Sequence, residues 1–361
     1  MNKFDALKAK LLEEKAPEHL PFDKGLSSGS TLINLACTSR PDVAFLPGRY
    51  FHFVGDSSSG KTFLCLTVFA EACINPVFKD YRLIFDNAED GALMNLTKFF
   101  GPMLGDRLEP PAGSRKKPKY SDTVEGLFRN ADRALDDGAP FIYILDSTDT
   151  LSTSKEVKEH KAAKKLVDGD EEKGTYGTSR AKEFSNKMRM LHNRLRDDGR
   201  SMVFLITQTR SNIGFGAKFE PKTYSGGNSF IFYAAMQIWF SQAGHIKKTV
   251  KGKPRELGIY SKVRLKKNRV TGRDRSVVVP ILHSFGLDDL GGCLNYLIDE
   301  GHWKGKDSSV AAPEFDFDGN KEKLIRIIEE AGREGELREL TAKVWNEIES
   351  ACEVKRKSRY G

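Results

Sequence analysis

The stretch 54–62 reads VGDSSSGKT. Residues Gly55 to Thr62 match the phosphate-loop spacing G-x-x-x-x-G-K-[ST] in full. The preceding run, 50–54, is aromatic and β-branched, which predicts a buried strand. The following run, 62–74, is mostly apolar and lacks glycine and proline, which predicts a buried helix. We therefore predict a strand, a glycine-rich turn and a helix, in that order.

This order is what phosphate binding requires. Glycines let the backbone close around an anion, and the free N–H groups of the helix N-terminus point at it. In such a loop Lys61 reaches the β- and γ-phosphates of a nucleotide, and the Thr62 hydroxyl is a ligand of Mg²⁺. The alternative is a surface turn rich in serine and glycine that carries a stray lysine. Because both flanks fit, we favour nucleotide binding.

The composition predicts a soluble α/β protein with one large domain and smaller appendages. The chain has 361 residues, of which 39% are hydrophobic and 30% charged. No apolar run approaches the ~18 residues of a membrane span. Residues 1–16 lack the apolar core of a signal peptide and have the spacing of a short amphipathic helix. The five cysteines form no C-x-x-C pair, so we expect reduced thiols, a cytoplasmic location and no membrane partner.

Positive charge is clustered along the chain. The net charge is +8, and residues 247–275 contain twelve Lys or Arg against two acids. Smaller basic clusters lie at 115–119 and 354–361. Such clusters suit a polyanion such as nucleic acid. A merely solvated basic face is the alternative, and charge alone does not decide between them.

Strand and helix patterns alternate after the first strand, which predicts a mostly parallel sheet with helices on its faces. Further strands are predicted at 82–87, 141–147, 201–208, 234–240 and 262–268, and helices at 91–100, 122–137 and 180–197. Loops or insertions are predicted at 113–122, 152–179 and 211–229, and a linker at 307–320.

Ligands of such sheets collect at the carboxyl ends of the strands, and polar residues end several strands here. Asp146 follows FIYIL and is placed to hold Mg²⁺, although many strands end in Asp as a cap. Glu89 follows the second strand and is a candidate to activate a water, but a helix-capping role fits the local pattern better. Gln208 is a candidate donor to a γ-phosphate, or an amide that merely satisfies a strand end.

In chain order, GDSSSGKT, FDNAED, YILDS, LITQTRSNIGFGAKFEPKTYSGGNSFIFYAAMQIWF and VRLKKNR resemble the RecA family of DNA recombinases. The resemblance covers roughly residues 25–300, is most specific over 203–240, and is closest to phage-encoded members such as UvsX. It implies an α/β fold: a RecA-like P-loop ATPase core with a mostly parallel sheet flanked by helices, a short N-terminal helix and strand, and a small C-terminal helical appendage. The implied division is 1–45 for the N-terminal helix and subunit-contact segment, 46–285 for the core, and 286–361 for a C-terminal domain with a basic tail.

The resemblance also implies a function. It is that of an ATP-dependent recombinase, a DNA-dependent ATPase that forms helical filaments on single-stranded DNA and catalyses homologous pairing and strand exchange in recombination and repair. The implied cofactors are ATP and Mg²⁺. The implied partners are single- and double-stranded DNA and further copies of the chain, with single-strand-binding and loader proteins as further candidates. A RecA-fold accessory or annealing protein and a ring helicase remain alternatives.

Site residues are carried over by position. Triphosphate binding is implied for Gly55, Ser58, Ser59, Gly60, Lys61 and Thr62, and metal binding for Thr62 and Asp146. Glu89 matches the family's catalytic glutamate, Gln208 its γ-phosphate sensor, and Lys267 and Arg269 the cations that reach the neighbouring subunit's nucleotide. DNA-binding loops are implied near 168–182 and 211–229, with DNA contacts by Lys182, Arg189, Arg210, Phe219, Gly226, Gly227 and Asn228. The chain departs from the family at Leu93, where an adenine-contacting acid is expected, and in its basic tail.

Overall fold

Ten strands of the described residues form the central sheet of the protein. The computed structural model describes residues 20–163, 176–211, 222–224, 227–306, 308–357 and 359. The strand order is β12-β11-β10-β9-β1-β7-β6-β2-β3, and β8 pairs with β7 outside this path. The strands are β1 (Arg49–Gly55), β2 (Arg82–Asp86), β3 (Leu108–Glu109), β6 (Phe141–Leu145), β7 (Met202–Ser211), β8 (Lys222–Tyr224), β9 (Met236–Val250), β10 (Lys253–Asn268), β11 (Arg275–Leu282) and β12 (Gly286–Leu287).

Most of this sheet is parallel. β9, β1, β7, β6, β2 and β3 pair parallel, and β10, β11 and β12 extend the sheet in antiparallel pairs. Parallel sheets are normally covered on both faces, because their crossover connections place helices there. The predicted fold class, an α/β protein with a mostly parallel sheet flanked by helices, is confirmed.

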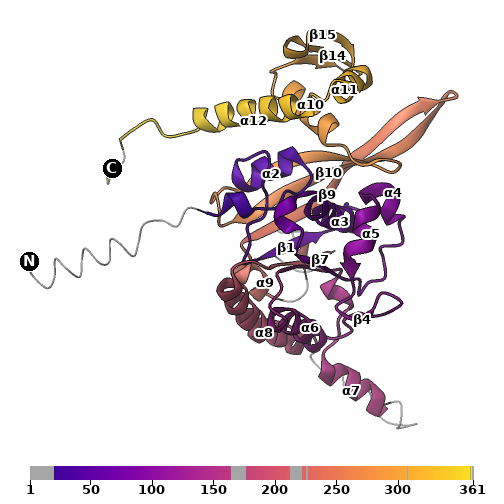
Figure 1. The fold of residues 1–361 in the computed structure, drawn as a ribbon, viewed down its shortest axis with the longest axis vertical. Coiled ribbons are helices and arrows are strands. Elements are labelled where there is room, and N and C mark those ends of the chain that lie inside the picture. Colours follow the sequence, from indigo (N-terminus) through magenta and orange to yellow (C-terminus); the bar gives the residue numbers. More distant parts are fainter. Residues whose placement is uncertain are drawn as a thin grey trace, which may run out of the picture.

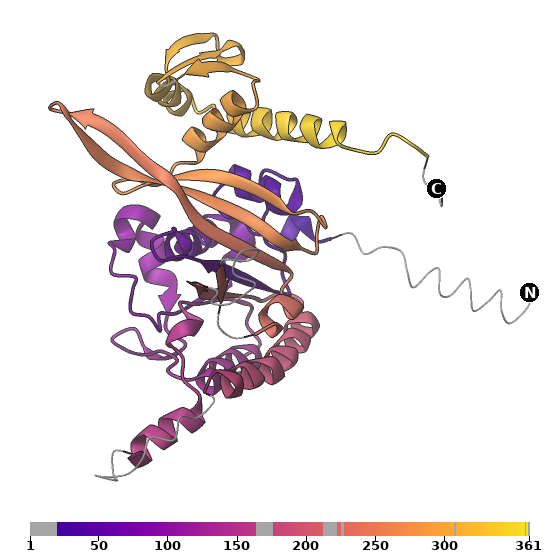
Figure 2. The same ribbon diagram turned by 180° about the vertical axis from the view of Figure 1, so that it is seen from behind.

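Helices cover both faces of the sheet, as Figures 1 and 2 show from opposite sides. The hydrophobic cluster on one face includes Leu64 and Phe69 of α3, and the cluster on the other includes Phe128 of α6 and Phe184 of α8. The helices of this region are α2 (Thr31–Thr38), α3 (Lys61–Ile74), α4 (Leu96–Phe100), α5 (Pro102–Arg107), α6 (Val124–Asp136), α7 (Ser154–Ala163), α8 (Tyr176–Asp198) and α9 (Ser229–Tyr233).

β9 and β10 are much longer than predicted and form a ribbon that projects from the body (Figure 2). Beyond Phe240 none of the β9 residues is buried. A two-residue turn joins the strands, and both of its residues, Lys251 and Gly252, have positive φ, as a type I′ hairpin requires. The ribbon carries most of the basic cluster at 247–275. Its outer part was missed because an exposed ribbon lacks alternating apolar residues.

Other predicted segments also differ from the structure; the loop predicted at 211–229 contains β8 in its described residues. Only 96–100 of the predicted helix 91–100 is helical, because Asn95 caps α4 by accepting the backbone N–H of Lys98 at 2.9 Å. The predicted loop 152–179 contains α7 and the first turn of α8 in its described residues. The loop predicted at 113–122 contains part of a small hairpin, β4 (Ala112–Ser114) and β5 (Lys117–Lys119). The linker predicted at 307–320 contains two strands, β14 (Ser309–Ala312) and β15 (Phe317–Asn320).

The C-terminal part has its own hydrophobic cluster, which includes Leu294, Trp303 and Leu324. Its helices are α10 (Asp289–Asp299), α11 (Lys321–Glu330) and α12 (Glu334–Ala351), and β13 (Lys304–Lys306) completes a three-stranded sheet with β14 and β15. The expected helical appendage therefore also contains a sheet. The helix predicted near the N-terminus lies outside the described residues. Among the described helices, none has the length and apolar character to cross a membrane.

A buried polar residue interrupts the apolar side of β1. His52 is fully buried, its Nε2 lies 2.9 Å from the Thr207 hydroxyl of β7, and its Nδ1 lies 3.1 Å from the Gln237 amide of β9. Burial lowers the pKa of His52 to about 3. The ring is therefore neutral in the folded protein, and it ties the three central strands together through side chains.

We expect this histidine to make stability pH-dependent. The unfolded ring has a pKa near 6.5, so between about pH 6.5 and pH 3 the unfolded chain binds the extra proton and the folded chain does not. The stabilisation is therefore complete above pH 6.5 and is lost as the pH falls, by up to about 1.4 kcal/mol per pH unit. Urea unfolding from pH 7 to pH 4 should show a flatter dependence for His52→Gln, and an unchanged slope would contradict the assignment. His245→Gln, on the exposed ribbon, is the matched control.

Candidate functional site

Four strand ends meet at one edge of the sheet. β1, β7, β6 and β2 are adjacent and parallel, so their carboxyl ends share this edge. The register places Gly55 of β1 beside Gln208 of β7, and Asp86 of β2 beside Leu145 of β6. Ligands of open α/β sheets bind at this edge. The residues that follow the four strands form the candidate site.

The loop from Gly55 to Thr62 has the conformation of a phosphate cradle. Ser58 and Gly60 both have positive φ, +59° and +93°, and α3 starts at Lys61. A side chain at Gly60 would place its Cβ 2.6 Å from Cδ1 of Ile281, so both conformation and space favour glycine. The N-terminus of α3 leaves backbone N–H groups without helical partners, which suits an anion.

Lys61 lies inside this loop. Its Nζ donates to the carbonyl oxygens of Gly55 at 2.8 Å and Asp56 at 2.5 Å, and the residue is buried. Burial lowers the pKa of Lys61, while the carboxylates of Asp146, Glu89 and Asp56 oppose this shift. Among the described residues, the acceptors of this buried ammonium are loop carbonyls, so it is well placed to pair with an anion.

Thr62 and Asp146 form a pair of oxygen ligands. The Thr62 hydroxyl donates to Oδ2 of Asp146 at 2.5 Å. Burial raises the pKa of Asp146 to about 6; Glu89 adds to this effect, whereas Thr62 and Lys61 oppose it. A hydroxyl and a carboxylate are the donors that Mg²⁺ prefers, and this ion usually takes one or two protein ligands together with phosphates and water. The donor set therefore fits the expected metal, although the described residues contain no cluster of three or more His, Cys, Asp or Glu with metal-binding geometry.

Glu89 and Gln208 are brought into direct contact. The Gln208 side-chain amide donates to Oε1 of Glu89 at 2.7 Å, and the backbone N–H of Glu89 donates to the carbonyl of Asp146 at 2.8 Å. Glu89 precedes α4 by several residues, and Asn95 caps that helix instead. The alternative role of Glu89 as the helix cap therefore does not hold.

Sequence reasoning missed Asp149, which follows Asp146 by three residues. Its Oδ2 accepts the backbone N–H of Gln208 at 2.7 Å, and its Oδ1 lies 3.5 Å from the guanidinium of Arg210. This carboxylate fixes the end of β7 where it leaves the sheet. An acid one helical turn after a strand end has no distinctive sequence signal, because such residues commonly cap turns.

Lys267 and Arg269 lie at the opposite edge of the sheet. Near the end of β10, Asn268 pairs with Met236, which in turn pairs with Phe51 near the start of β1. Four strand residues, about 13 Å, separate this level from Gly55. Both side chains donate to the carbonyl oxygen of Phe232 at the end of α9. Burial lowers the pKa of Lys267 to about 8, with Arg269 adding to the effect. Because of the separation of about 13 Å, neither Lys267 nor Arg269 reaches the phosphate loop of its own chain.

The candidate DNA-contacting residues are only partly described. Lys182 and Arg189 are exposed on α8, and Arg210 is exposed at the end of β7. Gly227 has φ +77°, and a Cβ there would lie 3.3 Å from Ala181 of α8. Gly227 therefore lies beside α8 at Ala181, the residue before Lys182. Phe219, Gly226 and most of the two predicted loops lie outside the described residues.

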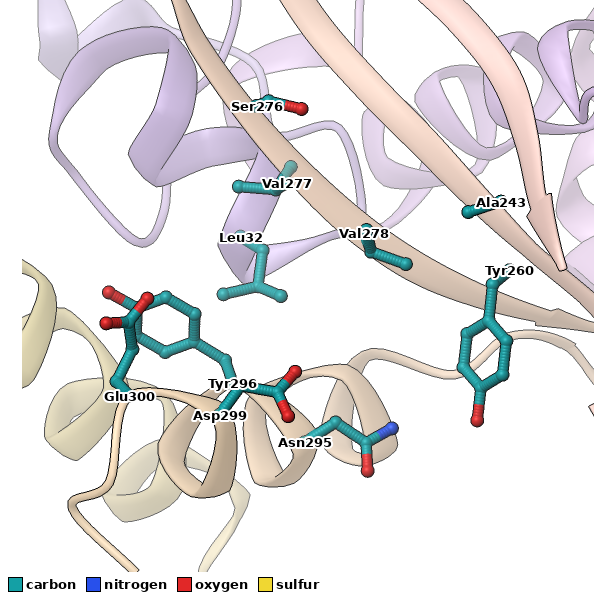
Figure 3. Close-up of a pocket in the computed structure, with 10 residues that line it drawn as sticks. All are labelled: Leu32, Ala243, Tyr260, Ser276, Val277, Val278, Asn295, Tyr296, Asp299 and Glu300. Carbon is teal, nitrogen blue, oxygen red and sulfur yellow. The ribbon is translucent and has the colours of Figure 1, made fainter.

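A cavity of about 510 Å³ lies between β11 and α10, and no residue of the phosphate loop lines it (Figure 3). Its lining includes the apolar or aromatic residues Leu32, Val278 and Tyr296 and the acidic residues Asp299 and Glu300. Carboxylates in the lining repel phosphates, so this cavity does not suit a nucleotide.

The chain is similar in sequence to known RecA proteins. A family model described as the RecA N-terminal domain matches residues 122–288. Protein RecA of Cereibacter sphaeroides is 30% identical over 302 residues, which cover 79% of this chain and 78% of the relative. Protein RecA of Paracoccus denitrificans is 29% identical over 280 residues, 76% of this chain and 68% of the relative. Protein RecA of Thioalkalivibrio sulfidiphilus is 27% identical over 281 residues, 77% and 71% respectively.

We expect Gly60→Ala to disrupt the phosphate loop. The substitution places an L-residue at φ +93° and its Cβ against Ile281, so the free energy of unfolding should fall by about 1–3 kcal/mol, and ATP binding should weaken. Gly105→Ala is the control, since no atom lies within 4 Å of a Cβ at that α5 position. Thermal unfolding and ATP titration of the two variants provide the test. Wild-type stability of Gly60→Ala would rule out the cradle conformation.

Proposed function

The chain belongs to the RecA family, and we propose that it is an ATP-dependent recombinase that assembles on single-stranded DNA and exchanges strands. The observation that carries the proposal is the hydrogen bond between Gln208 and Glu89, 2.7 Å long. It joins the candidate catalytic carboxylate to the strand that leads into the predicted DNA-binding segment. Occupancy of the nucleotide site and the position of that strand are thereby linked.

We propose that the loop from Gly55 to Thr62 binds the triphosphate of ATP. Gly55, Ser58, Ser59 and Gly60 shape the cradle, and Lys61 exchanges its carbonyl acceptors for phosphate oxygens. Thr62 and Asp146 would hold Mg²⁺, which neutralises charge on the phosphates when it is bound. Burial of Lys61 and Asp146 strengthens these interactions, since water competes less.

Glu89 is the proposed general base. Its carboxylate accepts the Gln208 amide through one oxygen, which leaves the other oxygen available to orient a water toward the γ-phosphate. Gln208 is the proposed sensor, because its amide can donate either to Glu89 or to a terminal phosphate. Asp149 holds the backbone of Gln208 in place in either arrangement.

The DNA surface is proposed to be basic and directed at the phosphate backbone. Lys182 and Arg189 on α8, Arg210 on β7 and the adjacent Gly227 and Asn228 would contact single-stranded DNA. The projecting β9–β10 ribbon offers further cations, among them Lys247, Lys251, Lys253 and Arg255. A ribbon of this kind can follow phosphates without reading bases.

Assembly into a filament would complete each site. We propose that Lys267 and Arg269 act on the neighbouring subunit's nucleotide, because they lie at the sheet edge opposite their own phosphate loop. Phe232, whose carbonyl oxygen accepts hydrogen bonds from both cations, is 70% exposed. An exposed aromatic side chain beside two cations is typical of a protein interface. A phage-encoded, UvsX-like origin, a cytoplasmic location and mediator proteins stay predictions.

The proposal is tested by electron microscopy and strand exchange. With single-stranded DNA and a slowly hydrolysed ATP analogue, we expect helical filaments, and with homologous duplex we expect exchanged strands. Glu89→Gln should still bind ATP and DNA, but its DNA-stimulated ATP turnover should fall by about 10²–10⁴-fold, since it lacks the base. Rings would favour a helicase, and filaments that anneal but never exchange strands would favour an annealing protein. Near-normal turnover by Glu89→Gln would remove Glu89 from the mechanism.

Mixed assemblies test action between subunits. Arg269→Ala should reduce DNA-stimulated hydrolysis by about 10³-fold or more, and Lys61→Ala should be inactive for lack of the phosphate-loop cation. When the two are mixed, junctions at which an intact loop faces an intact Arg269 should recover part of the activity. Lys304→Ala, an exposed residue of β13, is the control for loss of a surface cation. No recovery at any ratio, despite demonstrated co-assembly, would place Arg269 outside the site.

A further inference from the structure

The end of β7 presents two different faces to the candidate site. Side chains alternate along a strand, and Gln208 and Arg210 point toward Glu89 and Asp149. Thr209, between them, points the other way. β8 pairs with this part of β7, with Thr209 opposite Tyr224 and Ser211 opposite Lys222. Lys222 and Tyr224 therefore share the face of Thr209.

Asp56 of the phosphate loop binds side chains on this second face of β7 and β8. The Thr209 hydroxyl donates to Oδ1 of Asp56, and the Lys222 ammonium pairs with Oδ2. One carboxylate thus binds both strands of the β7–β8 pair. The contact also connects the phosphate loop to residues on both sides of segment 212–221, which lies outside the described residues.

The Lys222 ammonium and the Lys61 ammonium of the phosphate loop both bind Asp56, so the two cations lie close together. The backbone carbonyl of Asp56 accepts Lys61 Nζ, and its side chain accepts Lys222. Lys222 keeps half of its side chain exposed, and Asp56 keeps a third. Partial burial alone would raise the pKa of Asp56, but hydrogen bonds from Lys222 and Thr209 and the charges of Lys222 and Lys61 together lower it. The charged Asp56 carboxylate therefore pairs with the Lys222 ammonium, which is also a suitable partner for a phosphate.

We propose that Lys222 distinguishes ATP from ADP: its ammonium pairs with Asp56 when no terminal phosphate is bound in the loop, and it pairs with the terminal phosphate when ATP is bound. The proposal rests on nucleotide binding at the phosphate loop as proposed above. A γ-phosphate brings more negative charge than the single carboxylate, and its oxygens accept charge-assisted hydrogen bonds. ADP lacks this group, so the pair with Asp56 persists. Lys222 would then be a specificity-determining residue supplied by the chain's own β8.

The test measures the affinities for a non-hydrolysable ATP analogue and for ADP, without DNA, by titration calorimetry. Lys222→Met should lower the preference for the ATP analogue over ADP by about tenfold or more, the effect of losing one hydrogen bond to a charged group. Asp56→Asn keeps an oxygen for Thr209 but frees Lys222, so the preference for the ATP analogue should rise. In the Lys222→Met background, Asp56→Asn should lose most of this effect. Lys222→Arg should restore the wild-type preference.

A static ion pair predicts another pattern. Both single variants would then change the affinities for the ATP analogue and ADP by the same factor, and this result would overturn the proposal. Lys304→Met is the control for loss of an exposed lysine, and thermal unfolding shows that each variant is folded. If strand exchange fails but the preferences behave as expected, the inference holds and only the recombinase proposal falls. If the wild-type protein binds neither nucleotide, both proposals fall.

Discussion

Parallel pairing of β1, β7, β6 and β2 is the constraint on which the site depends. The four strands run in one direction, so their last residues lie at a common edge, and side-chain alternation decides which of them face a ligand. β7 lies between β1 and β6, so Gln208 is between the phosphate loop and the turn that carries Glu89. A shift of β7 by one residue would exchange its two faces. Gln208 would then turn away from Glu89, and Thr209 would turn away from Asp56.

The hydrogen bonds around His52 oppose such a shift. His52 binds Thr207, one residue before Gln208, and Gln237 of β9, and both contacts are buried. Thr207 also lies 3.0 Å from the hydroxyl of Thr148, which follows Asp146 closely. An apolar core of the same shape would tolerate sliding more readily, whereas unpaired buried polar groups are costly. The polar residues inside the sheet therefore fix the register that the functional edge needs.

Sequence patterns predicted what depends on local chemistry and missed what depends on pairing. The phosphate loop has a fixed spacing, and its flanking strand and helix are both apolar, so β1 and α3 were predicted nearly to their ends. Glu89 and Gln208 were ambiguous from local sequence, because an acid or amide after a strand has several common uses. Asp56 and Asp149 carried no signal, since their partners are residues of β7 and β8 that lie far from them in the sequence. The length of the β9–β10 ribbon was underestimated because both faces of its outer part are exposed, so its sequence lacks alternating apolar residues.

The placement of Lys267 and Arg269 has a consequence for the geometry of any assembly. If one edge of each subunit supplies cations to a site at the opposite edge of the next, the contact is heterologous, since two different surfaces meet. Repetition of such a contact without closure gives a polymer with distinct ends. One end presents a phosphate loop that no neighbour completes, and the other presents cations with no nucleotide to bind. Growth and disassembly at the two ends would then differ, and the polymer would have a direction along the DNA before any nucleotide is hydrolysed.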